Sequence, residues 1–170
     1  TEARIYADYI LTHHPGARIG VLYQNDDFGR DYLAGLKDVL QDRYPQMVVA
    51  SLPYEISEPT IDSQIVAIKA AAPDIFINVA TPKFAAQAIR KLAELDWHPV
   101  HIMTNVSVSV SSVLKLAGLD NAKGVLSAGY QMDVTDPQWD SYPAMQHFRA
   151  FMAKYYPDAD RSESGRRGRR

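Results

Sequence analysis

The sequence has no cysteine, and this absence removes several kinds of site at once. Disulfides, thiolate zinc sites and cysteine nucleophiles all require that side chain. The five histidines are scattered, and no two are spaced as in H-x-x-x-H, which would present both rings to one metal from a helix. We therefore expect neither a metal centre nor a bound cofactor.

Long apolar runs are also missing. Hydrophobic residues make up 46% of the 170 residues and charged residues 22%, but no run approaches the roughly 20 apolar residues of a membrane span. This length suits one ordinary domain with a sizeable core.

Basic residues are scarce outside the C-terminal end. Residues 161–170 hold five of the 18 Lys and Arg and one of the 20 Asp and Glu, which leaves 13 against 19 in residues 1–160. An acidic body argues against nucleic acid as a partner, because such domains gather cations on a folded face. The basic tail is either a tether to nucleic acid or membrane or, as we favour, a non-native end; its composition predicts disorder over 159–170.

Glycine-rich phosphate loops are missing as well. Gly29 is the only glycine in the loop between the first predicted strand and the helix after it, so neither G-x-G-x-x-G nor G-x-x-x-x-G-K-[ST] is formed. Asp26-Asp27 resembles the acidic pair of a phosphorylated receiver domain, but the third run ends in Asn78-Val79-Ala80-Thr81, without the phospho-acceptor aspartate. The alternative for the pair is capping of a helix N-terminus.

What the sequence does contain is a regular alternation of apolar runs and amphipathic segments. Strands are predicted at 18–23, 47–53, 74–79, 100–103 and 125–130, and helices at 2–14, 29–44, 60–72, 82–95 and 141–156, with a short helix ending at Gly118. This alternation predicts an α/β fold, a three-layer αβα sandwich with a mostly parallel five-stranded sheet. We assign 1–132 to a ligand-binding lobe, and 133–158 to a crossing linker and helix.

Four loops should meet where parallel strands end, which is where open α/β sheets bind ligands. The candidate binding residues in these loops are Asp27, Phe28, Gly29, Ala80, Thr81, Pro82, Asn105 and Ser107. They include no pair of nucleophile and base, so the pattern favours binding of a small polar or amphipathic molecule over catalysis. Structural alternatives remain open, since Phe28 can be a hydrophobic staple, Thr81 and Pro82 can start a helix, and Asn105 and Ser107 can shape a loop.

Several segments resemble the second lobe of type I periplasmic solute-binding proteins. They are ARIGVLYQNDDFGRDYLAGLK, DIFINVATPKFAAQAIRKL, HIMTNVSVSVSSVLKLAG and AKGVLSAGYQMDVTDPQW. More narrowly, they resemble the leucine/isoleucine/valine-binding group that serves ABC importers. The resemblance implies a periplasmic receptor whose two lobes close over a solute, commonly an amino acid or an organic or aromatic acid. It also implies a membrane permease as partner.

The resemblance also implies roles for individual residues. Phe28-Gly29 matches an aromatic-glycine pair whose ring faces the cleft, and Thr81 takes the place of a frequent tyrosine. The loop 104–107 lacks the carboxylate that often pairs with a ligand ammonium, which implies an acid without an ammonium group. The helix 141–156 would pack on a first lobe in relatives, so we expect an exposed apolar stripe and self-association here.

Two further interpretations use the same fold. One is a doubly wound enzyme or switch that binds a nucleotide or flavin, which would require a phosphate loop that the sequence does not show. The other is the ligand-sensing core of a transcriptional regulator or receptor of the same architecture, which would require an attached DNA-binding or membrane segment.

Overall fold

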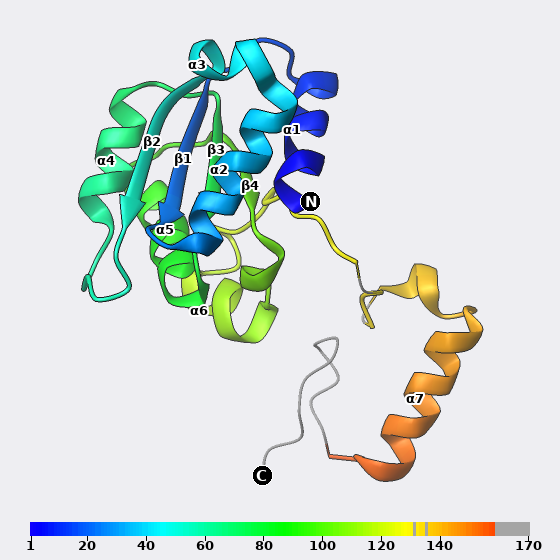
Figure 1. The fold of residues 1–170 in the computed structure, drawn as a ribbon. Helices are drawn as coiled ribbons and strands as arrows, with labels where there is room; N and C mark the ends of the chain where they lie inside the picture. The colour runs from blue at the N-terminus through cyan, green and yellow to red at the C-terminus, as the bar shows by residue number, and fades with distance from the viewer. Residues whose placement is uncertain (131, 135, 159–170) are drawn as a thin grey trace.

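A computed structural model describes residues 1–130, 132–134 and 136–158 (Figure 1). The helices are α1 Glu2–His13, α2 Asp27–Leu40, α3 Tyr44–Met47, α4 Asp62–Ala70, α5 Pro82–Glu94, α6 Lys115–Ala117 and α7 Pro143–Tyr155. The strands are β1 Ile19–Gln24, β2 Val48–Tyr54, β3 Ile75–Val79 and β4 Val100–Met103. The predicted tail at 159–170 lies outside the described residues.

The four strands form one parallel sheet in the order β2-β1-β3-β4. β1 is central and pairs with β2 on one side and β3 on the other, with Tyr23 opposite both Pro53 and Val79. This register ends the strands together, at Gln24, Tyr54, Val79 and Met103. The loops that carry the candidate site therefore leave the sheet at one edge, as predicted from the sequence.

The prediction of a fifth strand at 125–130 is wrong for the sheet as it is formed. Leu126 makes one isolated parallel bridge to Ile102, with its N–H donating to the His101 carbonyl and its carbonyl accepting from Met103. Pairing does not continue because the N–H of Ala128, two residues later, donates to the Tyr6 hydroxyl rather than to β4. In the part of the chain that the structure describes, four strands and one bridge replace the expected five strands.

Two hydrophobic cores lie on opposite faces of the sheet, which confirms the predicted three layers. α1 and α2 cover one face, where Ile10 and Leu36 pack with the side chains of Val21 and Ile77. α4 and α5 cover the other face, where Ile65 and Ile89 belong to the same core as Phe76. Alternate strand residues therefore serve different cores, as expected of strands that are buried on both faces.

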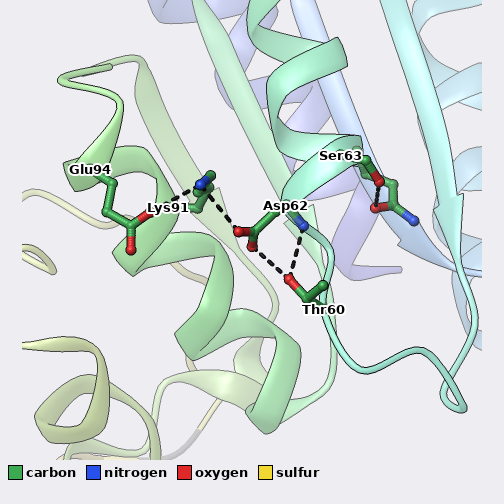
Figure 2. Close-up of polar contacts among 6 residues, drawn as sticks. Thr60, Asp62, Ser63, Lys91 and Glu94 are labelled. Carbon is green, nitrogen blue, oxygen red and sulfur yellow. Dashed lines mark hydrogen bonds and ion pairs between the residues drawn. The ribbon is translucent and has the colours of Figure 1, made fainter.

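A polar network joins α4 to α5 on the surface of the second layer (Figure 2). Lys91 binds the carboxylates of Asp62, at 3.1 Å, and Glu94, at 3.0 Å. The Thr60 hydroxyl donates to the Asp62 carboxylate at 2.6 Å and accepts from the Asp62 N–H at 3.2 Å. The sequence placed the start of this helix at residue 60, whereas the helix begins at Asp62, with Ile61 at the N-cap position.

The segment after α2 also differs from its prediction. The sequence suggested a helix as far as Tyr44-Pro45, whereas α2 ends at Leu40 and Gln41 adopts a φ of 48°. Pro45 then lies in the first turn of α3, where a proline without an N–H is tolerated, rather than ending a helix. The proline therefore marks a helix start.

Helix α7 lies apart from the αβα layers (Figure 1). It is attached to the segment before it by Arg149, which binds the Asp140 carboxylate at 2.6 Å and the Val134 carbonyl at 3.0 Å. Aromatic side chains on the helix are exposed, among them Phe148, Phe151 and Tyr155. The helix thus presents an apolar stripe that the sheet and its helices do not cover.

Candidate functional site

The carboxyl edge of the sheet is organised around the hydroxyl of Tyr54, the last residue of β2. This hydroxyl donates to the Gln24 side-chain oxygen at 3.0 Å and accepts from the Thr81 N–H at 3.0 Å. The Thr81 hydroxyl also donates to the Gln24 oxygen, at 3.2 Å. Tyr54 and Gln24 are only 1% and 9% exposed, so this buried network joins the ends of β1 and β2 to the start of α5.

This network changes the role of Thr81 at the start of α5. Thr81 occupies the N-cap position, but its side chain makes no capping hydrogen bond because the hydroxyl is engaged by Gln24 and Tyr54. The first turn of α5 contains no acidic residue and does contain Lys83. The positive end of this helix therefore faces the edge without a capping carboxylate or hydroxyl.

The start of α2 is built in the opposite way, because a carboxylate caps it. Asp26 accepts from the Gly29 N–H at 3.1 Å and from the Gln24 side-chain amide. The hydrogen bond from Gln24, followed by that from Gly29, lowers the pKa of Asp26 from its ordinary value. The capping interpretation of the acidic pair thus describes Asp26.

Asp27 and Phe28 lie beside this cap. Asp27 is exposed and forms a 3.1 Å ion pair with Arg30, one turn later in the helix. Phe28 is half-buried, and its ring meets that of Tyr32 edge-on with 5.2 Å between centroids. Phe28 therefore combines packing with partial exposure, and both of the roles considered for it remain compatible with its position.

Gly29 is explained by a close contact with the strand before it. A Cβ added there would lie 1.9 Å from the carbonyl oxygen of Gln24, so no other residue fits without moving the backbone. Gly29 is buried, and the space beside it is filled by the chain itself. Its presence is thus accounted for by the packing of α2 against β1, without a phosphate cradle.

The loop after β4 is held by a hydrogen bond at each end. The Asn105 N–H donates to a carboxylate oxygen of Glu2 at 2.8 Å, and the Ser107 hydroxyl donates to the Ala80 carbonyl at 2.6 Å. Ser107 and Ala80 are fully buried, whereas Asn105 and the neighbouring Val106 reach the surface. Within this loop, the side chains of Asn105 and Val106 are the ones available to a ligand.

Glu2 and its two tyrosine partners were not predicted from the sequence. Both oxygens of Glu2 are used, one by Asn105 and Tyr6 and the other by the Tyr32 hydroxyl at 2.7 Å. Burial, followed by the hydrogen bond to Glu2, raises the pKa of both tyrosines well above the ordinary value. Both hydroxyls therefore stay protonated and act as donors.

The predicted site residues thus differ in what they offer at this edge. Asp27, Phe28, Thr81, Pro82 and Asn105 reach the surface, whereas Gly29, Ala80 and Ser107 are buried supports. Sequence reasoning missed Gln24, Tyr54, Glu2 and Tyr6. Gln24 and Tyr54 are polar residues that end apolar runs, a signal that could have been used, but nothing in the local sequence marks Glu2 or Tyr6.

No group of three or more His, Asp or Glu in the described part of the chain is arranged to hold a metal ion. None of the described helices has both the length and the apolar character that a membrane crossing requires.

Comparisons with solved structures identify the fold. A substrate-binding periplasmic protein from Ralstonia solanacearum matches 90% of this chain with a TM-score of 0.76 and 22% identity; the chain covers 42% of it. A possible leucine/isoleucine/valine-binding protein from Rhodopirellula baltica SH 1 matches 93% of this chain (TM-score 0.72, 18% identity) and is covered to 42%. A fatty acid ABC transporter substrate-binding protein from Thermomonospora curvata matches 92% (TM-score 0.70, 19% identity) and is covered to 40%.

The chain thus spans less than half the length of these structures. No curated protein sequence matches it. Its sequence does match the family described as periplasmic binding protein, over residues 1–168. This match extends over nearly the whole chain and agrees with the parallel sheet and its two helical layers. The chain belongs to the periplasmic binding protein family.

Proposed function

We propose that this chain is a lobe of the extracytoplasmic solute receptor of an ABC importer, and that it binds a small organic acid at the carboxyl edge of its sheet. The family and the fold support the receptor role. The proposed mechanism is binding, in which closure against a second lobe buries the solute and presents the closed form to a membrane permease. No catalytic step is part of this proposal.

The observation that carries the proposed ligand class is the uncapped start of α5. Because the Thr81 hydroxyl is engaged by Gln24 and Tyr54, it leaves the first-turn N–H groups without a side-chain acceptor. Such N–H groups and the helix dipole stabilise an anion. Lys83 in the same turn adds a positive charge. A carboxylate is the group that we propose for this position.

The remaining part of the proposed ligand is apolar. Ile56, in the loop after β2, is 69% exposed, and Val106, in the loop after β4, is 52% exposed. Phe28 is half-buried at the same edge of the sheet. Apolar walls with a few polar groups are typical of small-molecule sites. A carboxylic acid with an aliphatic or aromatic body suits this set, and one structural neighbour is described as a fatty acid ABC transporter substrate-binding protein.

NMR titration of this chain with matched probes tests the ligand class. Isovalerate carries the carboxylate alone, L-leucine carries both charges, and leucinamide carries the ammonium alone. We expect isovalerate to shift the amides of Thr81, Lys83 and Phe84 at concentrations up to about 10 mM, since one lobe supplies only part of the contacts. Leucinamide should not change the chemical shifts of these amide resonances.

A matched variant sharpens this titration. Lys83→Met removes the charge next to the proposed carboxylate, and we expect weaker shifts with isovalerate, whereas Lys69→Met, on α4, should change nothing at this edge. Shifts that appear with leucinamide but not with isovalerate would contradict the ligand class. Nucleotide or flavin binding at the same amides would favour the alternative of a nucleotide-binding domain.

The exposed stripe on α7 supports a proposal about association. Phe148, Phe151 and Tyr155 follow helical spacing and are exposed. The helix that carries them lies apart from the αβα layers (Figure 1). Contiguous exposed apolar surface on a soluble protein marks an interaction site. We propose that two copies of this chain associate through α7 when no other protein surface covers it.

A further inference from the structure

One tyrosine hydroxyl lies between the loop after β4 and the segment by which the chain leaves the αβα layers. The Tyr6 hydroxyl accepts from the Ala128 N–H at 3.2 Å and lies 3.4 Å from the Ser127 hydroxyl. It also donates a hydrogen bond to the carboxylate of Glu2, and the same carboxylate accepts from the Asn105 N–H at 2.8 Å. The chain leaves these layers beside the start of α1 (Figure 1).

From this arrangement we propose that Glu2 and Tyr6 are positioning residues that couple the loop 104–107 to the exit segment at Ser127 and Ala128. The proposal rests on the function proposed above, because the loop 104–107 is one of the walls of the site. A change in the position of Asn105 is transmitted through Glu2 and Tyr6 to the exit segment.

The single proton of the Tyr6 hydroxyl gives the coupling its physical basis. Two acceptors compete for this proton, the carboxylate of Glu2 and the carbonyl of Met103, which lies 2.8 Å away. Any shift of Glu2 therefore changes how strongly the hydroxyl accepts from Ala128, because hydrogen bonds in a chain polarise one another.

The charge of Glu2 makes the same link cooperative. Glu2 forms no ion pair with any described residue, and its carboxylate is stabilised by neutral donors from Tyr6, Tyr32 and Asn105. Such charge-assisted hydrogen bonds are about twice as strong as those between neutral groups. Since one charge serves all three donors, weakening one contact changes the others.

Amide hydrogen exchange of this chain, measured residue by residue by NMR without any ligand, tests the coupling through its cross effects. Glu2→Ala removes the acceptor of Asn105, and Tyr6→Phe removes the acceptor of Ala128 while keeping the buried ring. We expect each variant to speed exchange at both Asn105 and Ala128, by roughly tenfold at the directly affected amide and several-fold at the other. Glu2→Gln retains one carbonyl acceptor and should restore part of the protection at both amides.

Two controls separate coupling from general destabilisation. Tyr9→Phe changes a tyrosine of the same helix away from the cluster, and the amide of Asn25, which donates to the Tyr54 carbonyl at 2.9 Å, reports on the opposite side of the edge. If the coupling is specific, Tyr9→Phe leaves exchange at Asn105 and Ala128 unchanged. Glu2→Ala and Tyr6→Phe leave exchange at Asn25 unchanged. Exchange that rises only at the directly affected amide of each variant overturns the proposal, and so does an equal rise at Asn25. Because no ligand is used, these outcomes are independent of the acid titration.

Discussion

The Tyr54 hydroxyl lies 3.0 Å from both the Gln24 side-chain oxygen and the Thr81 nitrogen, so that one group joins the end of β2 to the end of β1 and the start of α5. The three elements carry three of the loops at the proposed site. Their relative positions therefore depend on a buried polar contact as well as on the apolar cores. This contact also explains why α5 begins without a side-chain cap.

Removal of the Tyr54 hydroxyl should lower the stability of the folded chain. Tyr54→Phe keeps the ring against Phe84, at 4.5 Å between centroids. It leaves the Thr81 N–H without its acceptor and the Gln24 oxygen with the Thr81 hydroxyl in place of two donors. We expect a loss of about 1 to 3 kcal/mol in the free energy of unfolding, because a buried polar group is left unpaired. Urea denaturation measures this change, with Tyr130→Phe as the exposed control. Equal stability of the two variants would contradict the role given to the hydroxyl.

A second prediction concerns Gly29. A Cβ at this position would lie 1.9 Å from the Gln24 carbonyl oxygen, so Gly29→Ala forces α2 away from β1. We expect a loss of at least about 2 kcal/mol in the free energy of unfolding. Gly124→Ala is the matched control, because a Cβ there meets open space and only the positive φ of 81° opposes it. A Gly29 variant as stable as the Gly124 variant would show that the close contact is not as the structure has it.

The sequence alone predicted the helices and strands whose hydrophobic pattern is unambiguous. The run before Ala80 predicted β3, since a continuous apolar segment is typical of a strand buried on both faces. The fifth strand could not be excluded in this way, because its end is decided by Tyr6, more than a hundred residues earlier. The end of α2 at Leu40 depends on a positive φ at Gln41, which is not glycine and gives no warning in the sequence.

The candidate site was predictable to a smaller degree. The loops were placed correctly because parallel strands end at a common edge. The partners within the site come from distant segments, such as Gln24 with Tyr54 and Glu2 with Asn105, and no local pattern encodes such pairs. Sequence reasoning therefore located the edge without finding the hydrogen bonds that shape it.

A third prediction follows from the burial of His101. The Asn78 amide nitrogen lies 3.3 Å from the His101 Nε2, and as a donor it requires that this nitrogen carry no proton. Burial lowers the pKa of His101 to about 4 from its ordinary value of 6.5. The unfolded chain therefore binds a proton that the folded chain resists, so stability is complete above pH 6.5 and falls as the pH drops toward 4.

The size of this effect is up to about 3 kcal/mol at the low end of that range. Urea denaturation at several pH values measures this effect. His101→Gln should remove most of the slope of the free energy of unfolding against pH between pH 6.5 and 4. His147→Gln, at an exposed position on α7, should leave the slope unchanged. A slope that persists in the His101 variant would assign the pH dependence to other groups.

The last prediction concerns the apolar stripe of α7. Phe151→Asp places a charge in the stripe formed with Phe148 and Tyr155, and we expect a lower association constant in sedimentation velocity over a range of protein concentrations. Ala153→Asp adds the same charge on the opposite side of the helix and should not alter association. Deletion of 137–170 should leave a monomer that still melts cooperatively, because the two cores of the sheet are formed by residues before this segment. If the deletion abolishes cooperative melting, α7 stabilises the lobe itself, and its exposed aromatic residues require a different explanation.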